Sequence, residues 1–149
     1  MKIKFGLVLI IAIIISCKTK GDKPLPIVGT WQLISGTLIE KGDTTITDYT
    51  KNISFIKIIN DTHFGFFQHD LNKGKDSTAS FSSGGGLYSL IDSVYTEHLD
   101  YCSARNWEGN DFKFTIKIKN DTLLQSGVEK IESEGVNRIN IEEYVRVKK

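Results

Sequence analysis

The stretch FKFTIKIKNDTLL, residues 112–124, decides the fold class that this sequence predicts. Its apolar residues occupy every second position from 112 to 118, and lysine or threonine stands between them. Because successive side chains of a β-strand point to opposite faces, this alternation predicts a strand with one buried and one solvated face. Asn120 and Asp121 then tolerate the positive backbone angles of a tight turn. We therefore expect an antiparallel hairpin here.

The same pattern of short apolar runs and polar turns repeats along the chain. Asn60-Asp61-Thr62 and Asp92-Ser93 are typical of further hairpin turns. The other predicted strands cover residues 29–39, 53–59, 63–67, 86–91, 94–102 and 139–147. No stretch sustains helical spacing. We predict an all-β protein, an antiparallel meander of about 8–10 strands that closes into a barrel, because closure removes exposed strand edges.

Length and composition indicate one compact domain. The chain has 149 residues, of which 40% are hydrophobic and 25% are charged, enough apolar surface for a single core. The formal net charge is +1 and the basic residues are scattered. Electrostatics therefore offers no reason to expect nucleic acid as a partner.

The N-terminus carries the most specific local signal in the sequence. Lys2 and Lys4 precede an apolar run over residues 5–15, which is too short for the roughly 20 residues of a membrane-spanning helix and predicts a cleaved signal peptide. Residues 14–17, Ile-Ile-Ser-Cys, resemble the bacterial lipobox. That resemblance implies cleavage before Cys17 and acylation of its thiol; the alternative is an ordinary signal peptide that ends near a cysteine.

These signals predict three segments and a location. We expect a lipoprotein signal peptide over residues 1–16, the lipidated cysteine and a tether over residues 17–27, and the barrel domain over residues 28–149. Lys18 stands where inner-membrane lipoproteins carry aspartate, and the tether lacks an acidic run. By resemblance, both features favour an outer-membrane anchor facing the periplasm. With Cys17 acylated, Cys102 is the remaining thiol, so no intramolecular disulfide is expected.

Two ends of the predicted barrel carry a family resemblance. Gly29-Thr30-Trp31 and the final Glu-Glu-Tyr-Val-Arg of residues 142–146 resemble the calycin signature, in which an arginine of the last strand stacks on the tryptophan at the barrel floor. The stretches DTHF (61–64), GGGLY (84–88) and YTEHLDYC (95–102) resemble the uncharacterised lipocalin-like domain of Bacteroidetes lipoproteins. The resemblance covers residues 28–147. It implies a lipocalin-like barrel with Trp31 and Arg146 at its floor and a pocket, but no established ligand.

Alternation also predicts which side chains face the barrel interior. The candidate ligand-binding residues of the lumen are Phe64, Phe66, Tyr88, Tyr95, Glu97 and Tyr101. Aromatic groups and one carboxylate around an apolar lumen suit a small hydrophobic or amphipathic ligand. The same residues would also form a packed core in which tyrosines satisfy Glu97. The predicted function is a membrane-anchored lipoprotein that binds such a ligand; the alternative is a ligand-free interaction or inhibitor module of the cell envelope, whose protein partner the sequence does not identify.

Catalytic and metal chemistry find little support in the sequence. Gly84-Gly85-Gly86 precedes a strand rather than a helix, so it is typical of a hairpin loop or bulge and not of a phosphate cradle. His98, Asp100 and Cys102 share one predicted strand face, but residues two apart on a strand lie about 7 Å apart, too far for one ion without a second strand. We therefore expect no catalytic residues, no metal and no cofactor. Trp107 lies in a predicted loop, where it either rims the barrel or packs against it.

Overall fold

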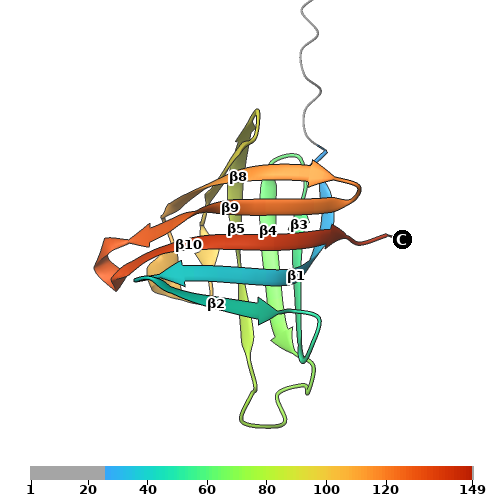
Figure 1. The fold of residues 1–149 in the computed structure, drawn as a ribbon, viewed down its shortest axis with the longest axis vertical. Coiled ribbons are helices and arrows are strands. Elements are labelled where there is room, and N and C mark those ends of the chain that lie inside the picture. The colour runs from blue at the N-terminus through green and yellow to red at the C-terminus, as the bar shows by residue number, and fades with distance from the viewer. Residues whose placement is uncertain (1–25, 149) are drawn as a thin grey trace, which may run out of the picture.

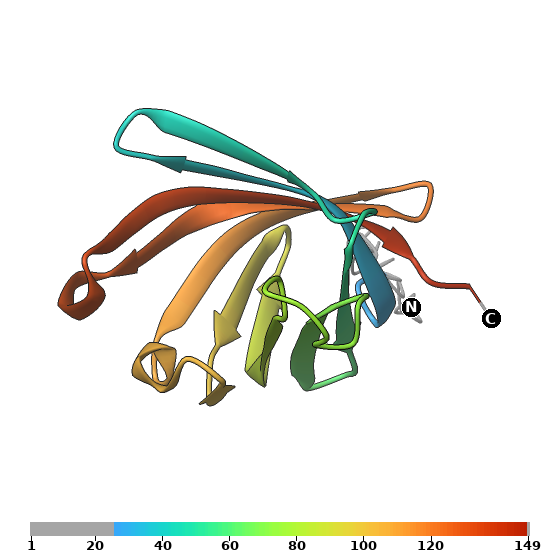
Figure 2. The ribbon, with the colours of Figure 1, turned by 90° about the horizontal axis from the view of Figure 1, so that it is seen from below.

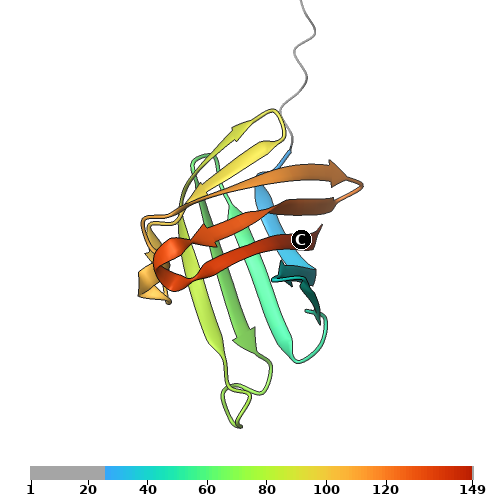
Figure 3. The same ribbon diagram turned by 60° about the vertical axis from the view of Figure 1, so that its left-hand side comes forward.

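The computed structural model describes residues 26–148 of the chain, and strands dominate this range. The strands are β1 Gly29–Glu40, β2 Asp43–Asp48, β3 Ile53–Ile59, β4 His63–Asp70, β5 Phe81–Ile91, β6 Val94–His98, β7 Tyr101–Cys102, β8 Asp111–Lys119, β9 Thr122–Ile131 and β10 Val136–Arg146. Two 3-10 helices, η1 Arg105–Trp107 and η2 Glu132–Glu134, interrupt them. In Figures 1 and 3, β8, β9 and β10 cross over β3, β4 and β5.

The strands form a closed antiparallel barrel. Around the barrel the order is β10, β9, β8, β6, β5, β4, β3 and β1, and β1 pairs with β10 to close it. The additional strands β2 and β7 pair with β1 and β5, respectively. Figure 2 shows the sheet curved around an interior, with β1 and β10 on one side and β4 and β5 on the other. The prediction of an all-β meander that closes into a barrel is confirmed.

The predicted hairpin turns are present, and local polar chemistry explains them. Asn120 and Asp121 adopt positive φ values of 49° and 62° between β8 and β9, and Asp92 has φ 55° between β5 and β6. Between β3 and β4, Asn60 Oδ1 accepts hydrogen bonds from the backbone N–H groups of Thr62 and His63 at 2.9 and 2.7 Å. The turns at Asn120-Asp121 and Asp92 thus adopt the positive backbone angles that the sequence indicated, whereas the turn at Asn60 relies on a side-chain acceptor.

Trp31 and Arg146 close one end of the barrel, as the family resemblance implied. They are paired in register on β1 and β10, and the Arg146 guanidinium lies 4.0 Å from the centre of the fully buried Trp31 ring. Arg146 Nη1 also donates to the carbonyl of Val28 at 2.9 Å. A Cβ atom at Gly29 would collide with this guanidinium, which accounts for glycine two residues before the tryptophan.

Ile27, the residue before the predicted start of the barrel domain at 28, packs into the core. Ile27 is only 3% exposed, and its carbonyl accepts a hydrogen bond from Trp31 Nε1 at 2.7 Å. Within the described range, the buried apolar residues run from Ile27 to Tyr144, and every barrel strand is paired on both sides. The barrel is thus a self-contained unit. The predicted signal peptide, Cys17 and the tether up to residue 25 lie outside the described residues.

The whole glycine triplet lies within a strand, rather than in the hairpin loop or bulge predicted before the strand at 86–91. Gly84, Gly85 and Gly86 lie within β5, paired with Phe66, Gly65 and Phe64 of β4. On the other side, the chain after β6 approaches so closely that a Cβ atom at Gly86 would collide with the carbonyl oxygen of His98. The absence of a side chain therefore serves close backbone packing.

Replacing Gly86 with alanine is expected to lower the free energy of unfolding by about 1–3 kcal/mol, because the chain around residues 98–100 must move. Urea denaturation of the purified domain measures this change. Gly65→Ala on the neighbouring strand is the matched control, since its Cβ would lie 3.7 Å from the nearest atom, the carbonyl oxygen of Gly84. Equal stability of the two variants would contradict the expectation.

Candidate ligand-binding site

A cavity of about 380 Å³ occupies the half of the barrel away from Trp31. Its walls come from the later part of β1 and the early part of β10, and from the strands between them. Among its lining residues Ala104 is exposed and Trp107 is half-buried, so we place its opening to solvent beside them. The other apolar and aromatic lining residues are Leu38, Tyr49, Phe55, Phe66, Leu99, Phe112 and Phe114. The fold therefore leaves room for a small ligand, which the sequence had not decided.

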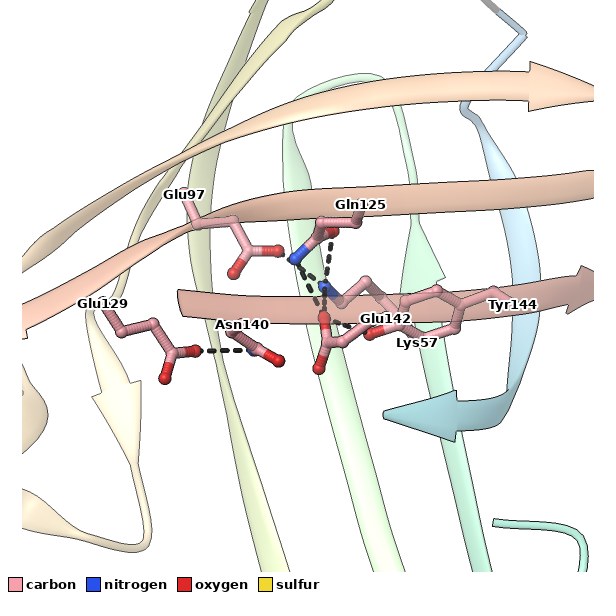
Figure 4. Close-up of polar contacts among 7 residues, drawn as sticks. All are labelled: Lys57, Glu97, Gln125, Glu129, Asn140, Glu142 and Tyr144. Carbon is pink, nitrogen blue, oxygen red and sulfur yellow. Dashed lines mark hydrogen bonds and ion pairs between the residues drawn. The ribbon is translucent and has the colours of Figure 1, made fainter. Parts of the chain in front are cut away.

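Lys57 is the central cation of the cavity wall. This β3 residue is only 2% exposed, and its Nζ donates to Glu97 Oε1 at 2.8 Å and to Gln125 Oε1 at 3.1 Å. Figure 4 shows these three side chains converging from β3, β6 and β9. Burial alone lowers the pKa of Lys57, but attraction to Glu97 and Glu142 outweighs it and raises that pKa. The carboxylates around Lys57 therefore favour its ammonium form.

Glu142 of β10 completes the group around Lys57. Its Oε2 accepts hydrogen bonds from Gln125 Nε2 at 3.0 Å and from Tyr144 Oη at 2.9 Å, and lies 4.0 Å from Lys57 Nζ. Burial raises the pKa of Glu142, while the attraction of Lys57 opposes that rise. We call Lys57, Glu97, Gln125 and Glu142 the polar cluster.

A second ion pair lies nearer the opening of the cavity. Glu129 of β9 accepts from Arg138 Nε at 2.6 Å and from Asn140 Nδ2 at 2.8 Å. The Arg138 guanidinium lies 5.3 Å from the centre of the Trp107 ring, which packs on Phe112 at 5.8 Å. Trp107 therefore lines the cavity and also packs against the core, so it combines the two positions considered for it. The contacts of Arg138 hold this ring beside the opening.

The structure places the six predicted lumen residues in four different positions. Phe66 and Glu97 line the cavity. Phe64 and Tyr95 are buried outside its lining, with their ring centres 6.0 and 5.9 Å from Lys57 Nζ. Tyr88 packs on Tyr95 at 5.3 Å, and its hydroxyl donates to the carbonyl of Asn60.

Tyr101 does not face the lumen, contrary to the prediction. It is 71% exposed, whereas Cys102 lines the cavity. Tyr88 pairs with Glu97, whereas Gly85, three residues earlier, pairs with Tyr101, four residues later. The chain between β6 and β7 therefore holds one extra residue relative to β5. An extra residue reverses the alternation of a strand, which turns Tyr101 outward and Cys102 inward.

Sequence reasoning missed most of the polar lining residues. The missed side chains are Lys57, Gln125, Glu129, Arg138, Asn140 and Glu142. A signal was present, because Gln125 and Glu129 share their alternation phase with the buried Leu123 and Ile131 of β9. Polar residues in phase with a core face indicate a polar interior, provided that the strand is regular.

His98 lies outside the cavity between two aspartates. Its Nδ1 lies 2.5 Å from Asp111 Oδ1, and its Nε2 lies 3.3 Å from Asp100 Oδ1. Cys102, the third residue of the metal hypothesis, faces the other way. Within residues 26–148, no three His, Cys, Asp or Glu side chains gather closely enough to hold a metal ion. In the same range, no helix is long and apolar enough to cross a bilayer.

The His98 pair is expected to make stability depend on pH. The hydrogen bond to Asp111 raises the pKa of His98 in the folded state, so its contribution is complete below the unfolded value of about 6.5 and is lost as pH rises through the folded value. The urea midpoint of wild type should therefore exceed that of His98→Gln by more at about pH 5.5 than at about pH 9. A difference that is the same at both pH values would contradict this account.

The fold and the cavity define this protein as a closed antiparallel β-barrel of meander topology, with a cavity above a tryptophan–arginine floor. Among solved structures, the chain is similar to a lipocalin-like protein from Bacteroides uniformis, with 15% sequence identity, a TM-score of 0.48, and coverage of 80% of this chain and 97% of that one. It is also similar to an uncharacterized protein from Bacteroides eggerthii, with 13% identity, a TM-score of 0.46, and coverage of 80% and 98%. No protein-family model and no curated protein matches the sequence.

Proposed function

We propose that this protein binds a small amphipathic ligand in the barrel cavity. One observation carries the proposal: a cavity of about 380 Å³ has aromatic walls and a buried polar cluster on one side. Ligand sites in proteins have volumes of about 300–1,000 Å³ and combine an apolar lining with a few placed polar groups. The apolar part of the ligand would contact Phe55 and Phe66, and its polar group would face Glu97 and Glu142. The proposal assigns binding, without a catalytic step or a cofactor, to this site.

Native mass spectrometry with organic extraction tests the proposal on residues 21–149 purified from a bacterial periplasm. We expect a stoichiometric extra mass that organic solvent removes. Ala104→Trp should reduce that occupancy by blocking the opening, since Ala104 is exposed and lines the cavity. Ala79→Trp, in an exposed loop away from the cavity lining, is the matched control and should retain the ligand. A ligand lost equally from both variants would place binding elsewhere.

We also propose that acylated Cys17 anchors the barrel to the outer membrane on its periplasmic side. The support is the sequence pattern of residues 1–17 and the tether composition. The described chain enters the barrel at Ile27 beside Trp31, at the end away from the cavity, so a membrane anchor would leave the opening accessible. Metabolic labelling with an alkyne fatty acid should mark the wild-type protein and not Cys17→Ala. Equal labelling would contradict the anchor.

A second candidate function, interaction with another envelope protein, is favoured by the outer surface of β4, β5 and β7. Phe67, Phe81 and Tyr101 are 45%, 69% and 71% exposed there. Under this proposal, crosslinking in cells captures a partner that the double variant Phe67→Ser/Tyr101→Ser loses and that Ala104→Trp retains. The two candidate functions thus respond to different substitutions.

A further inference from the structure

We propose that the polar group of the ligand is a cation, a protonated amine that hydrogen-bonds to Glu97 and Glu142. This inference rests on the proposed function, because it names the chemical class of the ligand in the same cavity. It follows from the unpaired acceptor oxygens and the charged side chains of the cavity wall.

The cavity wall has acceptor oxygens without donors. Glu97, which is 7% exposed, accepts one hydrogen bond through Oε1, and within residues 26–148 its Oε2 has no donor. The same holds there for Glu142 Oε1 and Asn140 Oδ1, since the contacts of these side chains use their other atoms. Among the described residues, the one fully buried side-chain polar atom without a partner is the hydroxyl of Tyr95. The three free oxygens are therefore reached from the cavity.

The donor nearest these oxygens, in contrast, is committed. Lys57 Nζ donates to Glu97 and Gln125, and it lies 4.0 Å from Glu142 Oε2. Arg138 gives its Nε to Glu129, and within residues 26–148 no acceptor is paired with its Nη groups. Beside Lys57, a ligand that brings N–H donors would complete the free acceptors, whereas a carboxylate placed there would meet acceptor oxygens.

The charges of the cavity wall also favour a cationic ligand. Three carboxylates, Glu97, Glu129 and Glu142, face two cations, Lys57 and Arg138. Glu142 Oε2 lies 4.0 Å from Lys57 Nζ, whose direct hydrogen bonds go to Glu97 and Gln125. An ammonium group would balance the carboxylates in a partly buried setting where unpaired charge is costly.

The aromatic walls also suit an amine with an apolar body. Phe55 stacks on Phe66 with ring centres 5.7 Å apart, and Tyr49 meets Phe55 edge-on at 5.9 Å. The faces of such rings attract cations as well as apolar groups.

Isothermal titration calorimetry with three probes tests the inference on residues 21–149. The probes are octylammonium, octanol and octanoate, which share one alkyl chain and differ in the polar group. We expect octylammonium to bind at least about tenfold more tightly than octanol, and octanoate to bind more weakly than either. This series requires no substitution, so it does not depend on the folding of a variant.

Variants then locate the cation. Glu97→Gln and Glu142→Gln should each reduce the ratio of octylammonium affinity to octanol affinity. Glu143→Gln, exposed on the outer side of β10 next to Glu142, is the matched control and should keep the preference. Thermal unfolding establishes that each variant is folded.

The outcomes separate this inference from the proposed function. Equal binding of all three probes, or tightest binding of octanoate, would overturn the cation assignment and leave the cavity as a ligand site. Failure of all three probes to bind the folded wild-type protein would overturn the proposed function, and the cation assignment with it.

Discussion

Replacing Lys57 with methionine is expected to lower the free energy of unfolding by about 3–5 kcal/mol, the usual effect of removing one partner from a buried ion pair. Lys57 is 2% exposed and is the ammonium group that Glu97 and Glu142 share. Methionine has a similar length but no charge, so it leaves these carboxylates facing each other without compensation. Urea denaturation at neutral pH measures the change.

Two further variants distinguish loss of the ion pair from a general effect of removing lysine. Lys117→Met on β8 removes an exposed lysine and should change stability by less than about 0.5 kcal/mol. Adding Glu97→Gln to Lys57→Met should restore part of the lost stability, because it removes one of the uncompensated charges. If Lys57→Met were as stable as wild type, the carboxylates would be satisfied without the ammonium group.

Replacing Trp31 with alanine is the second large expected effect, a loss of about 3–5 kcal/mol in the free energy of unfolding. The Trp31 side chain is fully buried, donates to the carbonyl of Ile27 and lies beneath Arg146. Alanine leaves a void at the barrel floor and removes the ring on which Arg146 stacks. Thermal and urea denaturation of the purified domain measure the loss.

Trp107→Ala is the matched control for this substitution. Trp107 is the other tryptophan of the chain, and it is half-buried at the cavity opening. Its removal should change stability much less than Trp31→Ala but should weaken ligand binding. Equal losses of stability from the two substitutions would contradict the division of the barrel into a packed floor and a binding half.

That division explains how one barrel holds both a core and a ligand site. The aromatic and apolar residues around Trp31 fill the half of the interior next to the floor. Lys57 lies at the boundary, with the rings of Phe64, Tyr95 and Tyr144 within 6.0 Å of its Nζ and the cavity on its other side. The polar cluster therefore stabilises the barrel and also presents the acceptor oxygens that we assign to the ligand.

Local sequence patterns were sufficient for the parts of this protein that depend on neighbouring residues. Alternation identified the strand over 112–118, and Asn120 and Asp121 identified its turn, because side-chain direction and turn conformation are local properties. The resemblance of residues 29–31 and 142–146 to a known signature led to the Trp31–Arg146 floor. Phe66 and Glu97 were placed in the lumen for the same local reason.

The outward direction of the Tyr101 side chain could not be predicted from local alternation. One extra residue between Glu97 and Tyr101 reverses the alternation, and that residue is visible only from the pairing with β5. The polar cluster is likewise non-local, since Lys57 meets Glu97 and Gln125 from strands that lie 40 and 68 residues away in the chain. The sequence by itself determined most of the strands, the turns and the closed meander, which follow from period-two patterning, but it indicated neither β2 nor the break between β6 and β7. Only the tertiary structure decided the register, the cavity and the partners of Lys57, because these depend on how distant strands meet when the barrel closes.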